Sequence, residues 1–180
     1  MINRKIARRY AKALMNIGRE DGNYDKYREE LDAFTDVFQQ EENLREVLRN
    51  PTFNVPRRQS IVKEISTRLR LGAITSNFLQ LLVEKDRIMY LPDVAALYSE
   101  LVDEAAGRAR VKLASAHDLS QKKIEELKKG LQALVGKQVI MEVETDPSLI
   151  GGVVARVGDT IYDGSVKTQL ARLKEIIAKR

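Results

Sequence analysis

The chain has 180 residues, of which 43% are hydrophobic and 32% are charged, so it has enough apolar side chains for one or two small cores. It contains no cysteine, which excludes disulfides, thiolate metal sites and cysteine nucleophiles and favours a reducing compartment. The net charge of +5 lies in residues 106–180, which carry 14 basic and 9 acidic side chains (14 − 9 = +5), because residues 1–105 carry 17 of each (17 − 17 = 0).

No stretch of the sequence predicts a membrane segment. The first residues, Met1 to Lys5, are charged and continue to Lys12 without an uninterrupted apolar region, which is not the pattern of a secretory signal. The longest uncharged apolar runs are much shorter than the roughly 20 residues that cross a bilayer. We therefore expect no direct membrane insertion, and any association with a membrane would be through a partner.

Residues 1–105 predict a bundle of six helices. Apolar residues recur there at helical spacing, and the breaks fall at Asn, Pro and Gly, for example at Asn50-Pro51 and near Gly72. Pro56 and Pro92 stand where the first turn of a helix tolerates proline. The six helices are expected at roughly residues 4–18, 24–38, 44–48, 56–72, 78–85 and 92–102.

After Gly107 the apolar period changes from that of a helix to that of a strand. Ser120 is expected to begin a helix that Gly136 ends, and Gly158-Asp159 is typical of a two-residue hairpin turn. Strands are expected at residues 109–113, 139–143, 153–157 and 160–162, and a last helix at about 165–179. The predicted fold is a two-domain α+β protein, with a six-helix bundle in residues 1–105 and a small α/β domain in residues 106–180. This second domain has a short mixed sheet and two helices.

The sequence shows no convincing catalytic or metal-binding constellation. The single histidine, His117, precedes Asp118, but no nucleophile stands at a defined spacing, which favours a turn or cap role over catalysis. Asp146, Asp159 and Asp163 each lie beside Gly or Pro, where aspartate usually closes a turn rather than binding a cation. We therefore expect no metal, no cofactor and no enzymatic activity of the chain itself.

The glycine pairs do not form nucleotide-binding motifs. Five residues separate Gly130 from Gly136, and no magnesium-binding hydroxyl follows Lys137, so the phosphate-loop pattern fails. Gly151 and Gly152 lack the third glycine and the following helix of a dinucleotide fingerprint. A strand entrance or bulge that needs compact backbone is the better explanation of this pair.

Two of the predicted helices are apolar around too much of their circumference. With successive residues about 100° apart, the apolar arc of the first helix is roughly 180° and that of the fifth roughly 200°, whereas a bundle-facing stripe needs little more than 100°. Burial within the bundle and a groove that receives an amphipathic helix from another protein both remain open as explanations. Ala7, Ala11 and Ala13 would let such a helix approach closely, and six cations with no acid before Glu20 favour an acidic partner.

Three segments of the sequence resemble a known family. They are the run from Tyr10 to Leu14, the run from Asp86 to Asp93, and a C-terminal region from Asp146-Pro147 through Gly151-Gly152 to the Asp-Gly-Ser-Val of residues 163–166. Together they resemble the delta subunit of bacterial F-type ATP synthase, the counterpart of the mitochondrial oligomycin-sensitivity-conferring protein. The resemblance covers essentially the whole chain.

The resemblance implies a non-catalytic subunit of the peripheral stalk, or stator, of the enzyme complex. The N-terminal domain would bind the N-terminal helix of an alpha subunit between its first and fifth helices, and the C-terminal domain would hold the C-terminal ends of the b subunits. The subunit would lie on the cytoplasmic face of the inner membrane as a peripheral protein, attached through the complex. The implied groove residues are Ile6, Tyr10, Ala13, Ile17, Phe78, Leu81 and Leu82, and a structural role falls to Gly151, Gly152, Asp163 and Ser165.

The basic character of the chain leaves one alternative function open. A pI of about 9.4 and an α/β C-terminal domain also suit a small RNA- or ribosome-associated protein. The neutral N-terminal half and the lack of aromatics in residues 106–180, where Tyr162 stands alone, speak against it. We therefore expect no nucleic-acid partner.

Overall fold

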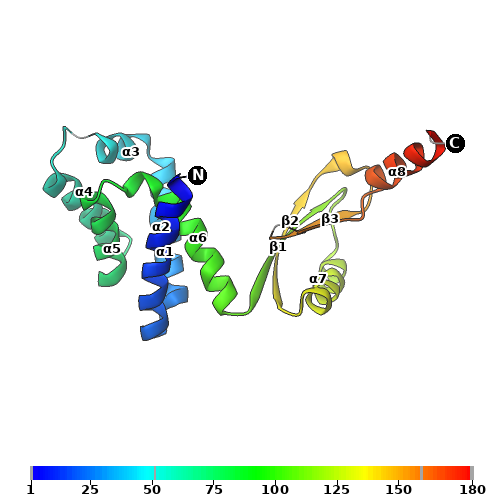
Figure 1. Cartoon of the computed structure of the whole chain (residues 1–180), viewed down its shortest axis with the longest axis horizontal. Helices are drawn as coiled ribbons and strands as arrows, with labels where there is room; N and C mark the ends of the chain where they lie inside the picture. The colour runs from blue at the N-terminus through cyan, green and yellow to red at the C-terminus, as the bar shows by residue number, and fades with distance from the viewer. Residues whose placement is uncertain (1, 51, 159, 179–180) are drawn as a thin grey trace. The chain divides into compact units, whose positions relative to one another are not determined.

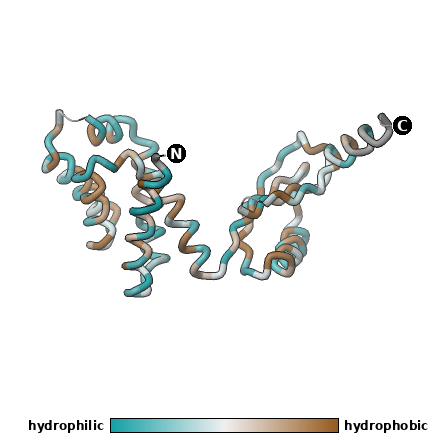
Figure 2. The backbone as a smooth tube through the Cα atoms, in the orientation of Figure 1, coloured by the Kyte–Doolittle hydropathy of each residue, from teal (hydrophilic) through white to brown (hydrophobic). Residues whose placement is uncertain are grey.

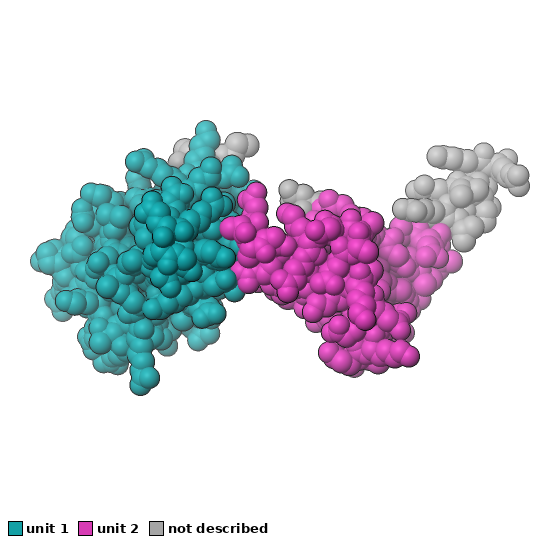
Figure 3. Space-filling view, turned by 90° about the horizontal axis from the view of Figure 1, so that it is seen from below, with its two compact units in different colours: residues 1–102 teal, residues 103–180 magenta. Residues whose placement is uncertain are grey.

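A computed structural model of the chain describes residues 2–50, 52–158 and 160–178. The chain divides into two compact units, Met1–Val102 and Asp103–Arg180, which are coloured separately in Figure 3. Helices make up the first unit, and the second combines a mixed four-stranded sheet with helices (Figure 1). The fold class predicted from the sequence is confirmed.

The first unit contains six α-helices and one short 3-10 helix among its described residues. Their bounds are α1 Ile2–Asp21, α2 Tyr24–Gln40, α3 Glu42–Arg49, α4 Val55–Arg68, α5 Ala73–Glu84, η1 Ile88–Tyr90 and α6 Leu91–Ala105. The last helix, α6, crosses the boundary between the units. The six predicted helices are therefore present, and only η1 was not expected.

The ends of α4 show how local chemistry sets the helix boundaries. Asn54 caps its start, because the side-chain Oδ1 accepts a hydrogen bond of 3.1 Å from the backbone N of Arg57. At the other end α4 stops at Arg68, earlier than expected, and Arg70 follows with a left-handed φ of 55°. Gly72 does not end α4 but is the N-cap residue of α5. Pro51, the predicted stop of the third helix, lies outside the described residues.

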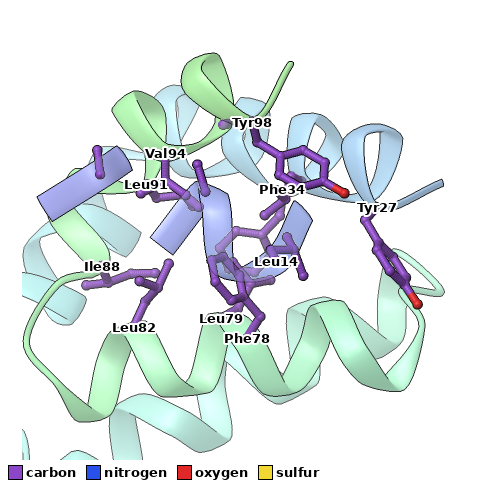
Figure 4. Packing of buried hydrophobic residues seen from close by; sticks show 14 of the residues in the cluster. Leu14, Tyr27, Phe34, Phe78, Leu79, Leu82, Ile88, Leu91, Val94 and Tyr98 are labelled. Carbon is purple, nitrogen blue, oxygen red and sulfur yellow. The ribbon is translucent and has the colours of Figure 1, made fainter. Parts of the chain in front are cut away.

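The core of the first unit is built from side chains of all its α-helices, and Figure 4 shows its centre. Leu14 of α1, Phe34 of α2 and Leu79 of α5 are each fully buried there. Burying one such side chain stabilises the fold by about 1.5–3 kcal/mol relative to leaving it in water. Tyr98 of α6 is buried too, and its hydroxyl donates to the backbone O of Tyr24 at 3.1 Å.

The second unit begins with the last turn of α6 and continues into the sheet. Its elements are β1 Arg108–Ser115, α7 Gln121–Val135, β2 Gln138–Thr145, η2 Pro147–Leu149, β3 Val153–Val157, β4 Thr160–Asp163 and α8 Val166–Ala178. The strand order is β2-β1-β3-β4. The pair β1–β2 is parallel, because α7 carries the chain back between them, and the pairs β1–β3 and β3–β4 are antiparallel.

One face of the sheet forms a small core with α7. Val111 pairs with Met141 on one side and with Val157 on the other, which places all three on the same face. Leu127 and Leu131 of α7 pack against this face. As predicted, Ser120 caps α7, accepting from the backbone N of Lys123 at 3.4 Å, and Gly136 ends it with a left-handed φ of 67°.

The junction between α6 and β1 contains ion pairs. Asp103, in the last turn of α6, lies 3.7 Å from Nε of Arg108 and 3.1 Å from Nε of Arg110, both in β1. The Arg110 side chain also reaches Glu142 of β2 at 3.3 Å. These contacts connect the start of the central strand to the helix before it.

The last helix leaves an apolar side exposed in its described part. Val166 is 37% exposed and Leu170 is 53% exposed. The side chains of Leu173 and Ile177, also expected on the apolar stripe, lie outside the described residues. The same holds for Asp159 of the hairpin turn and Lys179 at the predicted end. Among the described helices, none combines the length and the apolar character that a membrane span requires.

Candidate protein-binding groove

An open groove lies between α1 and α5. The two helices run in opposite directions in Figure 1, and they meet where the rings of Tyr10 and Phe78 pack edge to face, with centroids 6.3 Å apart at 70°. The volume of the groove is about 600 Å³. Its lining consists of Ile6, Arg9, Tyr10, Ala13, Leu14, Ile17, Phe78, Leu81, Lys85 and Arg87.

The wide apolar arc of α1 is divided between the core and the groove. Ala7, Ala11 and Leu14 are fully buried against the bundle. On the adjoining side Ala13 is exposed and Ile17 is 41% exposed. The bundle therefore covers only part of the apolar surface of α1, and the rest faces the groove.

The apolar arc of α5 is divided in the same way, and most of this helix is hydrophobic in Figure 2. Leu79 and Val83 are fully buried in the core, Phe78 is 8% exposed at the boundary, and Leu81 is 39% exposed in the groove. Leu82 differs from the expectation, because it is fully buried and does not line the groove. Its position one residue, or about 100°, beyond Leu81 turns it into the bundle.

The groove has a cationic rim. Three of the lining residues are basic, namely Arg9, Lys85 and Arg87, and none of the lining residues is acidic. The side chain of Lys85 bonds Glu84 at 2.8 Å, and this hydrogen bond raises the pKa of the ammonium group. The guanidinium of Arg87 lies over the ring of Tyr90, 5.9 Å from its centroid. The apolar pattern does not reveal Lys85 and Arg87 as groove residues, because both follow the end of α5.

A side chain from α2 fixes the start of α5. The carboxylate of Glu30 accepts a hydrogen bond of 2.9 Å from the backbone N of Gly72 and another from the hydroxyl of Thr75. Gly72 has no side chain that could cap α5 itself, and Glu30 satisfies one free backbone donor at that helix end. The only signal in the sequence is an acid on the apolar side of α2, between Tyr27 and Leu31.

The four residues with an expected structural role form a second constellation, in the C-terminal unit. We call it the loop clasp, and define it as residues 151–153 together with residues 163–166. The backbone N of Gly164 donates to the O of Val153 at 3.0 Å, and the N of Val166 donates to the O of Gly151 at 2.9 Å. Two segments that carry the family resemblance are thus hydrogen-bonded to each other.

Close approach of atoms in the other half of the clasp explains Gly151 and Gly152. Gly152 has a φ of 79°, and a Cβ built there would lie 2.3 Å from the backbone O of Gly164. A Cβ on Gly151 would lie 2.9 Å from Cγ2 of Val166, which is a side chain rather than backbone. The steric requirement is therefore stricter at Gly152.

The other half of the clasp starts α8. Oδ1 of Asp163 accepts from the backbone N of Ser165 at 2.8 Å, and its Oδ2 accepts from the hydroxyl of Thr168 at 2.7 Å. Oγ of Ser165, which is almost fully buried, accepts from the backbone N of Thr168 at 3.3 Å. Both side chains thus satisfy free backbone donors at the helix start.

Asp118 and Asp146, two of the aspartates considered as chemical groups, are engaged in local structure. Asp118, beside the exposed His117, accepts a hydrogen bond of 2.8 Å from the hydroxyl of Thr145. Asp146 accepts from Ser148, and these hydrogen bonds hold the pKa of its carboxyl below the usual value. Within residues 2–50, 52–158 and 160–178, no group of three or more His, Cys, Asp or Glu is placed to hold a metal ion.

The chain is similar to proteins of known identity over nearly its whole length. It is 44% identical to the ATP synthase subunit delta of Syntrophus aciditrophicus over 179 residues, covering 99% of each chain. It is 42% identical to the ATP synthase subunit delta of Desulfatibacillum aliphaticivorans, covering 99% of this chain and 98% of that one.

The fold is also found in a solved structure. A chain of the mitochondrial ATP synthase hexamer of Toxoplasma gondii superposes with a TM-score of 0.71 at 23% identity, covering 96% of this chain and 97% of that one. The model of the family described as ATP synthase delta (OSCP) subunit matches residues 6–177. This match and the relatives in Syntrophus and Desulfatibacillum show that the chain belongs to the ATP synthase delta (OSCP) subunit family.

Proposed function

We propose that this chain is a non-catalytic peripheral-stalk subunit that links the catalytic head of an F-type ATP synthase to its membrane-anchored b subunits. Family membership supports the assignment to the complex. The single observation that carries the adaptor role is the apolar groove between α1 and α5, because a wide apolar surface of this kind is normally covered by a partner.

The occupant of the groove is the N-terminal helix of an alpha subunit. Tyr10, Leu81 and Ile17 supply apolar and aromatic contacts along the groove, and the small side chain of Ala13 leaves room for a helix to lie close to α1. An amphipathic helix in a groove uses anchors at i, i+3, i+4 and i+7, which suits a groove walled by two helices. Aromatic side chains such as Tyr10 often dominate binding energy at such sites.

The C-terminal unit holds the C-terminal ends of the b subunits. Its described surface exposes apolar side chains that its own small core leaves uncovered, among them Ile150, Ile161 and Leu170. Attachment to the membrane on the cytoplasmic face of the inner membrane then comes through the b subunits. The adaptor needs no membrane helix of its own for that role.

Because the subunit must transmit force, its contacts with the alpha subunit and with the b subunits must dissociate slowly. During proton-driven ATP synthesis the stalk must keep the catalytic head from turning with the rotor, so this subunit passes force between its partners. Resistance to force depends on slow dissociation more than on fast binding. An interface of the usual size, about 1,600 Å² in total, supports affinities from micromolar to subnanomolar, depending on its anchors.

The groove assignment is tested by calorimetric titration of the full chain with a synthetic peptide of the cognate alpha-subunit N-terminus. Leu81→Asp places a charge in the groove without disturbing the core, because Leu81 is already 39% exposed. Ala13→Phe fills the groove without adding charge. We expect either change to weaken binding by about 100-fold, because the charge would be desolvated or the helix excluded.

Val143→Asp is the matched control for the charged variant. Val143 is 41% exposed on β2 in the second unit and does not line the groove, so the same charge there should leave peptide affinity unchanged. Circular dichroism of all variants verifies that helical content is retained. Unchanged affinity in both Leu81→Asp and Ala13→Phe would refute the groove as the binding site.

A further inference from the structure

The cations of the groove are gathered at one of its ends. The segment after α5 contacts α1 through η1, and α5 runs opposite to α1 with Phe78 against Tyr10, so the end of α5 lies beside the first half of α1. Arg9, Lys85 and Arg87 therefore share this end. The other end of the groove is lined by Ile17, near the end of α1, and Ile74 at the start of α5 is also exposed.

Two of these three cations have no acidic partner among the described residues. Lys85 is paired with Glu84, whereas neither Arg9 nor Arg87 forms an ion pair within the described part of the chain. No acid precedes Glu20 in the sequence of α1, so nothing nearby in that helix neutralises Arg9. The end of the groove with these residues, which we call the cationic end, carries an excess of positive charge.

The two ends of a docked helix would experience different electrostatic environments. A helix of about 20 residues is about 30 Å long, whereas the Debye length at physiological ionic strength is about 8 Å. Charges at one end of the docked helix thus interact with the cationic end of the groove and hardly with the opposite one.

We infer that the cationic end of the groove receives the more acidic end of the docked helix and thereby fixes its direction. This inference rests on the proposed function, which makes the groove a helix-binding site, and it assigns Arg9, Lys85 and Arg87 as determinants of orientation. The helix macrodipole contributes about half a unit charge at each terminus, less than one carboxylate. The side-chain charges of the partner therefore decide the direction when the two effects oppose each other.

The direction is measured by paramagnetic NMR on the full ¹⁵N-labelled chain with the cognate alpha-subunit peptide. The peptide carries a nitroxide label at its more acidic end in one sample and at its other end in a second. We expect the first label to broaden the amide signals of Lys85 and Arg87, and the second those of Ile17 and Ile74. The reverse pattern would overturn the inference.

Charge reversal gives an independent measurement. The double variant Lys85→Glu/Arg87→Glu should bind the peptide about tenfold more weakly at low salt, and its affinity should no longer fall as salt is added. Lys63→Glu is the control, because Lys63 is exposed on α4 and lies outside the groove. An affinity equal to that of the unaltered chain would also overturn the inference.

Failure of the groove as the binding site and failure of the proposed direction give different experimental results. If the unaltered chain does not bind the peptide, the groove assignment itself is wrong and the inference falls with it. If the peptide binds and Leu81→Asp blocks it, but the label positions or charge reversal disagree with the expectation, the groove stands and only the direction is refuted.

Discussion

Glu30 and Gly72 are 42 residues apart in the sequence, yet a hydrogen bond of 2.9 Å from the backbone N of Gly72 to Oε1 of Glu30 joins them. A second hydrogen bond to the same carboxylate comes from Thr75. Because Gly72 begins α5, a side chain of α2 determines where one wall of the groove starts. The groove is thus supported by a residue that does not line it.

Replacing Glu30 should destabilise the first unit. Glu30→Ala leaves the donors of Gly72 and Thr75 without a partner in a buried place, which should lower the free energy of unfolding by about 1–3 kcal/mol. Urea unfolding followed by tyrosine fluorescence measures it, since five of the six tyrosines lie in residues 1–102. Glu29→Ala is the control, because Glu29 is exposed on the same helix. Equal losses in both variants would contradict the capping role.

The loop clasp can be tested by comparing two glycines of the second unit, Gly152 inside the clasp and Gly158 outside it. Gly152 and Gly158 both have positive φ, of 79° and 58°, but only at Gly152 would a Cβ meet other atoms within 4 Å. Gly158→Ala should lower stability by about 1 kcal/mol through backbone strain alone. Gly152→Ala should lower it clearly more, because the backbone O of Gly164 must move.

Thermal unfolding of the two glycine variants, with amide NMR spectra of residues 103–178, provides the measurement. The Gly152→Ala spectrum should show shifted signals for Gly164 and Val166, whose hydrogen bonds belong to the clasp. Equal destabilisation by the two alanines, with an unchanged clasp, would show that the close approach at Gly152 is unimportant.

The buried phenol of Tyr27 predicts a loss of stability at alkaline pH. Burial, together with a hydrogen bond donated to Asp21, raises the pKa of Tyr27 from 10.0 to about 12. The unfolded chain therefore releases this proton first, and its contribution to stability, complete below pH 10, is lost as the pH rises from about 10 to about 12. Burial raises the pKa of Tyr98 as well, which adds to the same trend.

The measurement is the free energy of unfolding between pH 8 and pH 12. Tyr27→Phe should be less stable than the unaltered chain at pH 8, because the hydrogen bond to Asp21 is gone. Its stability should then decline less steeply above pH 10. Parallel curves for the two proteins would mean that Tyr27 is not responsible for the alkaline decline.

Features with a local cause could be predicted from the sequence. The helical period of residues 1–105, the change to a strand period after Gly107 and the cap residues Ser120 and Gly136 all depend on neighbouring residues, and the structure has them. The excess apolar arc on α1 and α5 also follows from helix geometry, and both helices line the groove. The apolar arc of each helix can be predicted from that helix alone, whereas the groove is formed by the two helices together.

Features that depend on distant residues could not be predicted in the same way. Leu82 was expected in the groove, but only the packing of α5 in the bundle shows that it turns into the core. The cap of α5 by Glu30 and the contact of Gly152 with Gly164 join segments that sequence periodicity treats separately. Gly72 was expected to end a helix and instead starts one, because Arg70 takes the left-handed conformation at the end of α4.

The place of β1 in the sheet has a mechanical consequence. This strand follows α6 directly and is bonded on one side to β2 over eight residue pairs and on the other to β3. A pull directed along β1 loads both hydrogen-bond ladders in shear. Bonds loaded together must rupture together, whereas bonds at a sheet edge can be peeled apart one by one. The strand that follows the helix shared by the two units is thus the one best placed in this sheet to withstand sustained tension.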